Sequence, residues 1–93
     1  MTTVYVIEGR RVAGPDGFWR AVGEAVNGPG GYFGDNRDAF ADCLSGGFGT
    51  PEDGDFVIEW RDHDASRRAL GPALFDELVE IIDERAPGTL RLR

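Results

Sequence analysis

Two short apolar runs, Thr3–Glu8 (TVYVIE) and Phe56–Trp60 (FVIEW), are separated by helical patterns and not by a hairpin turn. Runs rich in β-branched and aromatic residues are typical of buried strands. Strands that alternate with helices pair in parallel, because each helix carries the chain back to the level at which the previous strand began. Leu90 and Leu92 in TLRLR predict a third, short strand. The alternation therefore predicts an α/β fold with a small three-stranded parallel sheet.

Three to four helices are expected around this sheet. The first begins in the turn Gly14–Gly17, with Asp16 as its N-cap, and ends at the segment Asn27–Gly31. A second, short helix lies within the stretch Tyr32–Phe48 (YFGDNRDAFADCLSGGF). A long loop, Gly46–Asp55, leads from it to the second strand.

Two further helical segments precede the last strand. The polar stretch after the second strand favours a short helical turn around Ala65–Leu70. The clearest helix begins at Pro72, since proline is favoured at the first helical position, and runs to Ala86. Ninety-three residues, 41% of them hydrophobic, suffice for one small core. We therefore expect a single domain over residues 1–93.

The chain is acidic, with a formal net charge of −7 at pH 7, and all ten of its basic residues are arginine. A protein that binds nucleic acid needs a basic face to neutralise phosphates, so the charge argues against nucleic acid and against an anionic membrane as partners. It favours a cationic partner, because opposite charges attract before contact. The absence of lysine excludes a phosphate-loop lysine and a Schiff-base lysine.

The sequence lacks the features of an exported protein. Its one cysteine cannot form an intrachain disulfide, and the start MTTVYVIEGR has no basic segment followed by an apolar run. No stretch approaches the roughly 20 apolar residues of a membrane span. We therefore expect a cytoplasmic protein that is monomeric when free.

No group of residues predicts a catalytic, cofactor or metal site. The only histidine, His63, is expected to be a solvated loop residue, because a catalytic or metal site needs convergent partners. Cys43 has aspartates but no basic residue near it in sequence, which favours a packed, unreactive thiol. The glycines within Gly28–Gly34 lack the spacing of a nucleotide-binding loop and are expected to form a turn.

The short helix carries three aspartates, Asp35, Asp38 and Asp42, which we call the acidic ridge. At about 100° per residue they fall within about 60° of arc, beside an apolar face. Asp35 can cap the helix, and Asp38 lies in the first turn, where the helix dipole favours negative charge. Asp42 falls in or near the last turn, where the dipole disfavours a negative charge by about 0.3–1 kcal/mol. A charge held at a cost in stability is a candidate for binding.

The residues around the acidic ridge resemble the signature of the barstar family, intracellular protein inhibitors of secreted bacterial ribonucleases. The matching pattern is two aromatics, a glycine, an acid and an asparagine, then Asp-Ala, an apolar pair and Asp-Cys-Leu, which here reads YFGDN and DAFADCL. The similarity continues through Ser45 and Gly46 and returns at FVIEWRD, residues 56–62. The expected order of strands and helices also matches the barstar-like fold.

The resemblance implies that the chain inhibits a guanyl-specific ribonuclease of the barnase or microbial type in a 1:1 complex, and is not itself an enzyme. Asp42 matches the aspartate that enters the ribonuclease active site and takes the place of an RNA phosphate. Asp38 matches a second acid of the same surface, and a late acid of the last helix, Glu84 or Asp83, matches another. The other matched contact positions are Tyr32, Gly34, Asn36, Ala41, Ser45 and Gly46.

The chain departs from the family pattern in ways that affect which ribonuclease it would bind. The type member of the family carries tryptophans where this chain has Ala41 and Gly47, and Phe48 is a candidate replacement for one of them. The loop Gly46–Asp55 is also longer. Two other functions stay open: a module that binds another cationic protein without inhibiting it, and a small ribonuclease. A ribonuclease would need a histidine–glutamate or two-histidine pair and a cationic cleft, and the single histidine and the acidic charge count against both.

Overall fold

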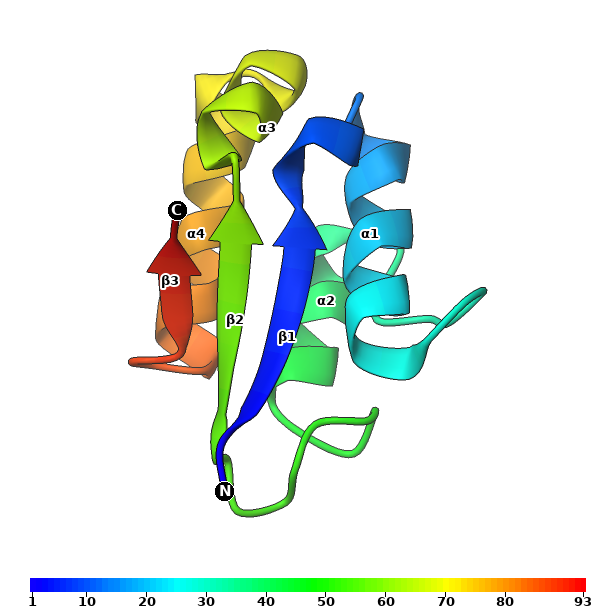
Figure 1. Ribbon diagram of the computed structural model, residues 1–93, viewed down its shortest axis with the longest axis vertical. Coiled ribbons are helices and arrows are strands. Elements are labelled where there is room, and N and C mark those ends of the chain that lie inside the picture. Colours follow the sequence, from blue (N-terminus) through cyan, green and yellow to red (C-terminus); the bar gives the residue numbers. More distant parts are fainter.

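The computed structural model describes residues 1–93, and the chain alternates strands and helices as expected (Figure 1). The sequence pattern therefore identifies the main elements correctly, apart from a short 3-10 helix. In chain order the elements are β1 (Thr3–Glu8), the 3-10 helix η1 (Gly9–Arg11), α1 (Pro15–Asn27), α2 (Arg37–Leu44), β2 (Phe56–Arg61), α3 (His63–Leu70), α4 (Pro72–Arg85) and β3 (Leu90–Leu92).

The three strands form one parallel sheet with β2 in the centre. Tyr5 of β1 lies opposite Ile58 of β2, and Ile58 in turn lies opposite Leu90 of β3. β1 has the predicted bounds, and β2 extends one residue further than predicted, to Arg61. The prediction of an α/β fold with a three-stranded parallel sheet is confirmed.

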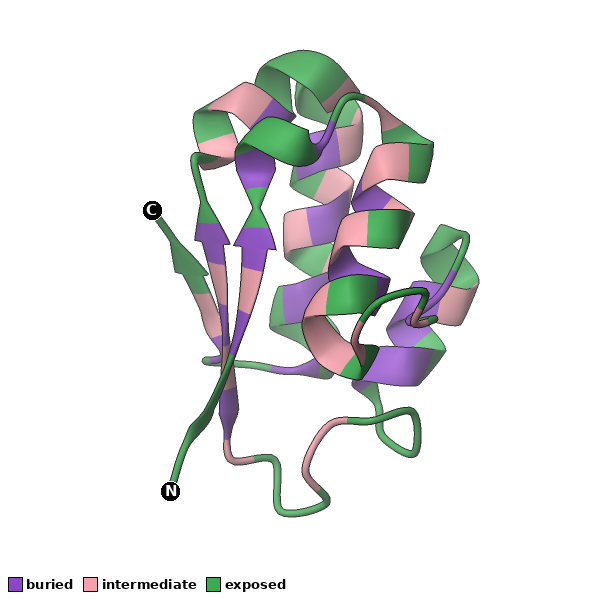
Figure 2. Cartoon of the chain, turned by 45° about the vertical axis from the view of Figure 1, so that its right-hand side comes forward, coloured by how far each residue is buried: buried purple, intermediate pink, exposed green.

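One face of the sheet is covered by α1, α2 and α4, and the other face is open to solvent (Figures 1 and 2). Side chains alternate between the two faces along each strand. Tyr5 and Ile7 of β1 are buried under the helices, whereas Val4 on the open face is exposed. Because the helices lie on one side only, α2 presents its outer face to solvent on the side of the molecule away from the open sheet.

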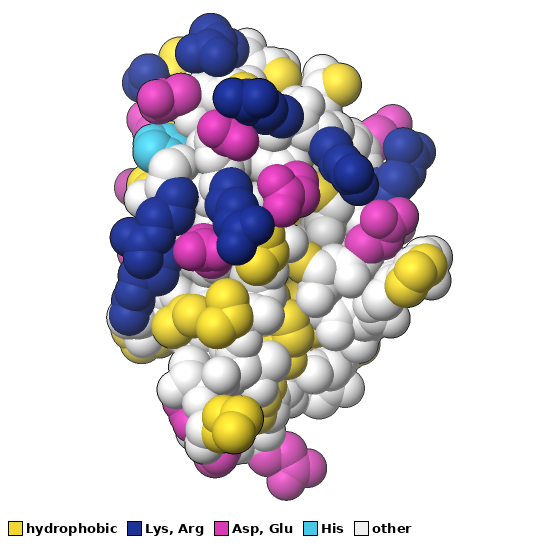
Figure 3. Space-filling view, in the orientation of Figure 1, with side chains coloured by type: hydrophobic (Ala, Val, Ile, Leu, Met, Phe, Trp, Pro, Cys, Tyr) yellow, Lys and Arg dark blue, Asp and Glu magenta, His cyan; other side chains and the backbone are white.

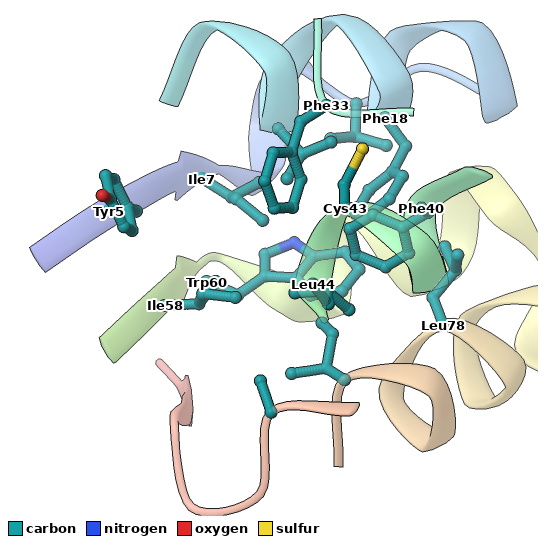
Figure 4. Close-up of a cluster of buried hydrophobic side chains, with 14 of the residues drawn as sticks. Tyr5, Ile7, Phe18, Phe33, Phe40, Cys43, Leu44, Ile58, Trp60 and Leu78 are labelled. Carbon is teal, nitrogen blue, oxygen red and sulfur yellow. The ribbon is translucent and has the colours of Figure 1, made fainter. Parts of the chain in front are cut away.

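The core is a single cluster of 16 buried apolar residues between the sheet and the helices. Phe40 of α2 packs edge-on against Phe18 of α1, with ring centroids 5.5 Å apart, and also against Phe33 (Figure 4). Trp60 is completely buried, and its indole N–H donates to Ser66 Oγ at 2.9 Å. The aromatic contacts anchor α2, a helix of eight residues that could not be stable alone.

The start of α1 differs from the prediction. Asp16 was the expected N-cap, but Gly14 is the capping residue, Pro15 is the first helical residue, and Asp16 lies within the first turn. Proline is favourable at the first helical position, since its fixed φ suits a helix and its missing N–H would have no partner there. Asp16 still benefits from the helix dipole, because it lies in the first turn.

His63 is not the solvated loop residue that was expected. It is the first residue of α3, and its side chain is only 27% exposed. Its Nδ1 lies 2.8 Å from the backbone oxygen of Arg93, and its ring stacks on that of Phe75. The left-handed conformation of Asp62 (φ 49°) turns the chain sharply from β2 into α3 and brings the histidine against α4. His63 thus fixes the end of the chain.

No helix combines the length and the apolar character that crossing a membrane would require. The side chains of His, Cys, Asp and Glu do not gather anywhere in groups of three or more that could hold a metal ion.

Candidate protein-binding surface

The helix α2 is capped by Asn36, one residue later than the Asp35 that was predicted. Asn36 Oδ1 accepts a hydrogen bond from the backbone N–H of Ala39 at 2.8 Å. Asn36 Nδ2 donates to Asp35 Oδ1 at 3.0 Å, so Asp35 is held beside the cap but lies outside the helix. Asp38 and Asp42 therefore share one side of α2, as helical periodicity predicts, whereas Asp35 does not belong to the helix.

Gly34 explains why the helix begins after residue 35. Its φ of 98° lies in the left-handed region, and a Cβ on Gly34 would stand 2.7 Å from the backbone of Phe40. Only glycine allows this close approach of the preceding loop to α2. Gly34 is buried, so its role in this surface is to place the loop and not to offer a side chain.

Asp38 and Asp42 lie one turn apart on the solvent side of α2, and both are exposed. At 100° per residue they stand about 40° apart, on the opposite side of the helix from Phe40 and Cys43. Phe40 and Cys43 are buried in the core. Core packing on one side of α2 therefore fixes the direction in which the two carboxylates project.

None of the three carboxylates of the acidic ridge forms an ion pair within the chain. Arg37, the nearest basic residue in sequence, pairs instead with Glu77 of α4. The last turn of α2 contains no basic residue that could compensate Asp42. Asp38 and Asp42 are thus negative charges without ion-pair partners on a packed helix, and Asp35 lies just before it.

Tyr32 lies close to this row. Desolvation raises the pKa of the Tyr32 hydroxyl, and the charges of Asp35, Cys43 and Asp42 raise it further. Burial raises the pKa of the Cys43 thiol, and the neighbouring Asp42 adds to that effect. Cys43 is 1% exposed, which confirms the prediction that it is a packed residue. The raised pKa of Tyr32 means that its hydroxyl is neutral at neutral pH, beside the aspartates.

The end of α2 is closed by Ser45, another of the matched contact positions. Its backbone N–H donates to the carbonyl oxygens of Ala41 and Asp42, at 3.2 and 3.1 Å. Ser45 Oγ donates to Ala41 O at 3.1 Å and accepts from Arg85 of α4 at 3.2 Å. Ser45 and Gly46 are exposed, whereas Ala41 is only 8% exposed and offers a partner little of its side chain.

Glu84 lies on the side of α4 that faces α2. Arg37 pairs with Glu77, and Ser45 bonds Arg85, so α2 and α4 run side by side in the same direction. Glu84 follows Glu77 by two helical turns and lies about 20° from it around the helix, whereas Asp83 lies about 120° from it. Of the two acids that the sequence left open, Glu84 is therefore the one nearer to the acidic ridge.

The carboxyl ends of α1, α2 and α4 point to the same end of the molecule, where the loop Gly46–Asp55 also lies (Figure 1). Each helix end carries the equivalent of about half a negative charge. The loop adds three acids, Glu52, Asp53 and Asp55. Asp42 thus stands in a region of negative potential.

Arginines gather elsewhere on the molecule. Figure 3 shows the open face of the sheet, with arginine side chains over its upper part. Arg61 of β2 bridges Glu8 and Glu59 there, and Arg93 lies 3.6 Å from Glu59. Acids are interspersed with these arginines and pair with them, whereas the carboxylates of the acidic ridge have no ion-pair partner.

Asn27 is a residue of this surface that the sequence does not identify. Phe48, considered only as a replacement for a tryptophan, is 47% exposed, and Asn27 bonds the backbone of both Phe48 and Tyr32. The sequence predicts only that Asn27 lies at the end of a helix. Its two hydrogen bonds could not be predicted, because both partners lie in loops whose conformation the sequence does not specify. The one feature of the sequence that indicates this part of the surface is Phe48, an aromatic residue in a glycine-rich loop.

Comparison with known proteins agrees with this description. The sequence model of the family described as Barstar (barnase inhibitor) matches residues 2–89. None of the curated proteins matches the chain. The barstar family consists of inhibitors that bind barnase-type ribonucleases. Since the match spans nearly the whole sequence, and the strands and helices have the arrangement expected of that fold, this chain belongs to the barstar family.

Proposed function

We propose that this protein inhibits a secreted, guanyl-specific bacterial ribonuclease by covering its active site with the acidic ridge. The observation that carries the proposal is the pair Asp38 and Asp42, exposed on one side of a packed helix and without ion-pair partners in the chain. A charged row of this kind is suited to an oppositely charged partner. The proposed complex is 1:1 and forms in the cytoplasm, where the enzyme would damage the cell's own RNA.

The physical reason is complementarity to a polyanion-binding cleft. A ribonuclease must hold RNA phosphates, so its active site is lined by cations. A carboxylate that enters this site accepts charge-assisted hydrogen bonds from the same groups that would bind a phosphate. Because Asp42 is fixed by helix packing, little side-chain entropy is lost on binding. Asp42 is therefore the proposed phosphate mimic, and Asp38 and Glu84 extend the negative surface around it.

The contacts beside Asp42 define which ribonuclease fits. At position 41 an alanine is buried, and at position 47 there is a glycine, so neither supplies a large apolar side chain. The apolar surface comes from Tyr32 and Phe48, which are exposed. A ribonuclease bound by this chain would thus meet an acidic helix flanked by two aromatic rings.

Coexpression with candidate ribonucleases tests the proposal. Cells that make a guanyl-specific ribonuclease without its export signal should survive when this protein is present, and the two should copurify as a 1:1 complex without RNA cleavage. If the two proteins copurify but the ribonuclease still cleaves RNA, the chain is a binding module and not an inhibitor. RNA cleavage by the protein alone would contradict both.

A further inference from the structure

One asparagine side chain, at the end of α1, joins two loops that are far apart in the sequence. Asn27 Nδ2 donates to the backbone oxygen of Tyr32 at 2.8 Å and to that of Phe48 at 2.7 Å. Because one nitrogen atom bonds both oxygens, the two backbones cannot separate by more than two hydrogen-bond lengths. Asn27 therefore sets the distance between the segment before α2 and the loop after it.

The surroundings of Asn27 leave its amide little freedom. A Cβ on Gly49 would stand 2.2 Å from Asn27 Oδ1, and one on Gly31 would stand 2.7 Å from Asn27 Cβ. The hydroxyl of Tyr5, on the neighbouring strand, donates to Gly49 O at 3.3 Å. Glycine at positions 31 and 49 thus lets both loops close tightly on the end of α1.

The two residues that Asn27 holds carry the exposed aromatic rings of this surface. Tyr32 is 51% and Phe48 47% exposed. The other exposed large apolar residues, Met1, Val4 and Leu92, lie at the N-terminus or on the sheet. Aromatic residues are enriched in the cores of protein interfaces, and tyrosine is common among the residues that contribute most to binding.

The acidic ridge alone is too small for a stable complex. A standard interface takes about 800 Å² from each partner, and α2 has only eight residues, of which four are buried. The neighbouring loops must supply the rest of the area. A loop that is already ordered loses less entropy on binding than a mobile one, which strengthens the complex.

We propose that Asn27 is a positioning residue of the partner-binding surface, which holds Tyr32 and Phe48 together as an apolar contact for the ribonuclease beside Asp42. The proposal rests on the proposed function and adds the loop Gly46–Asp55 to its surface. Asn27 does not touch the partner. It acts through the backbone positions of the two aromatic residues.

The test is the Kd of the complex between the full chain and a ribonuclease that the unaltered protein inhibits. Asn27→Ala and Asn27→Asp both remove the two N–H donors, and each should weaken binding at least tenfold. Phe48→Ala should weaken it similarly. The double variant Asn27→Ala with Phe48→Ala should lose much less than the product of the two single losses, because Asn27 acts through the position of residue 48.

Thr2→Ala provides a matched control. It also removes a side-chain hydrogen bond to the same loop, from Thr2 Oγ1 to Asp55 Oδ1 at 2.8 Å, but at the end of the loop away from Phe48. Its Kd should stay within twofold of the unaltered protein. Amide hydrogen exchange in the free protein should accelerate around residues 47–50 in Asn27→Ala and not in Thr2→Ala.

The outcomes separate this inference from the proposed function. If the unaltered protein binds a ribonuclease and Asn27→Ala, Asn27→Asp and Phe48→Ala bind it equally well, the inference is wrong and the proposed function stands. A double variant whose loss of affinity equals the product of the two single losses would likewise overturn the inference, since Asn27 would then act independently of Phe48. If the unaltered protein binds no ribonuclease, both are overturned.

Discussion

Among single residues, Asp42 has the position that folding explains least. It stands in the last turn of α2, near the negative end of the helix dipole, and it has no ion-pair partner. Its charge also contributes to the raised pKa of the buried thiol next to it in sequence, Cys43. Asp38 and Asn36, by contrast, lie where the helix start favours them. Binding to a cationic partner accounts for Asp42 in a way that stability does not.

Cys43 is expected to stabilise the fold and to take no part in binding. It lies among Phe18, Phe33 and Phe40 in the core (Figure 4). Cys43→Ala should lower the free energy of unfolding by about 1–2 kcal/mol, because it leaves a small cavity. Urea unfolding measures this loss, and inhibition should be unchanged. A folded variant that no longer inhibits would show that the thiol belongs to the binding surface.

The same thiol should make stability depend on pH in the alkaline range. Burial, followed by the charge of Asp42, raises the pKa of Cys43 above its ordinary value of 9.0. The unfolded thiol therefore ionises first as the pH rises. The stabilisation that the protonated Cys43 thiol gives the folded state is complete below pH 9.0, and it is lost as the pH rises through the pKa of the thiol in the folded protein.

Urea unfolding at pH 8 and pH 10 tests this dependence. The free energy of unfolding should fall between the two values, and it should fall less in Cys43→Ala. Burial also raises the pKa of Tyr5 above its ordinary value of 10.0. Both proteins should therefore lose further free energy of unfolding as the pH rises above 10.0. Equal losses in the two proteins would mean that the thiol does not titrate in this way.

At the scale of elements, α2 is a short helix that is stabilised by its cap and by its core contacts. Asn36 caps the helix, and the resemblance to the family also implies that it is a contact position, a role that stays a prediction. Asn36→Ala should cost about 1 kcal/mol of stability, because the N–H of Ala39 loses its partner. Asn36→Ser keeps a capping oxygen and should restore most of this loss.

Comparison of the two variants separates the roles of Asn36. Thermal unfolding should rank the serine variant near the unaltered protein, while the Kd for the ribonuclease rises in both variants. If the serine variant recovers affinity as well as stability, Asn36 acts only through the cap.

The sequence was informative about strands and about the existence of helices, and less so about helix starts. The apolar runs of β1 and β2 were predicted to within one residue, since buried strands have a strong composition signal. Asp35 and Asn36 are both good caps, so the choice depended on how Gly34 packs against Phe40, a contact beyond local sequence. α3 was predicted two residues too short because Asp62 turns the chain in an unusual left-handed conformation.

The candidate surface was predicted only in its helical part. Asp38 and Asp42 follow from helical periodicity, and their exposed positions agree with that expectation. The contribution of Asn27 could not be predicted, because it depends on two carbonyl groups from loops that the fold brings together. Nor could the alignment of α2 with α4, which distinguishes Glu84 from Asp83, be read from either helix alone.

For the molecule as a whole, the parallel sheet determines where negative charge accumulates. The helices α1, α2 and α4 run opposite to the strands, so their carboxyl ends gather at one end of the sheet (Figure 1). Asp42, in the last turn of α2, and the acids of the loop Gly46–Asp55 lie at this end, and arginines lie over the upper part of the open sheet face (Figure 3). The acids without ion-pair partners at this end should turn it toward a cationic enzyme during approach.

Association with the ribonuclease should therefore slow as salt is added. Between about 0.05 and 0.5 M salt the screening length falls to under about 5 Å, and the association rate constant should fall about tenfold or more. Stopped-flow mixing measures this rate, and the dissociation rate should change much less. An association rate that does not respond to salt would contradict steering by the acidic end.

The inhibition constant of Asp42→Ala, measured alongside its free energy of unfolding, tests the central claim most directly. Asp76→Ala is the matched control, since Asp76 is an exposed aspartate of α4 without an ion pair and its loss changes the net charge equally. Removing Asp42 leaves the cations of the enzyme unpaired in a desolvated site, a loss of about 3–5 kcal/mol, or at least a hundredfold in the inhibition constant. Asp42→Ala should be as stable as the unaltered protein or slightly more so, and Asp76→Ala should inhibit almost normally. Unchanged inhibition by a destabilised Asp42→Ala would mean that Asp42 serves the fold and that the partner binds elsewhere.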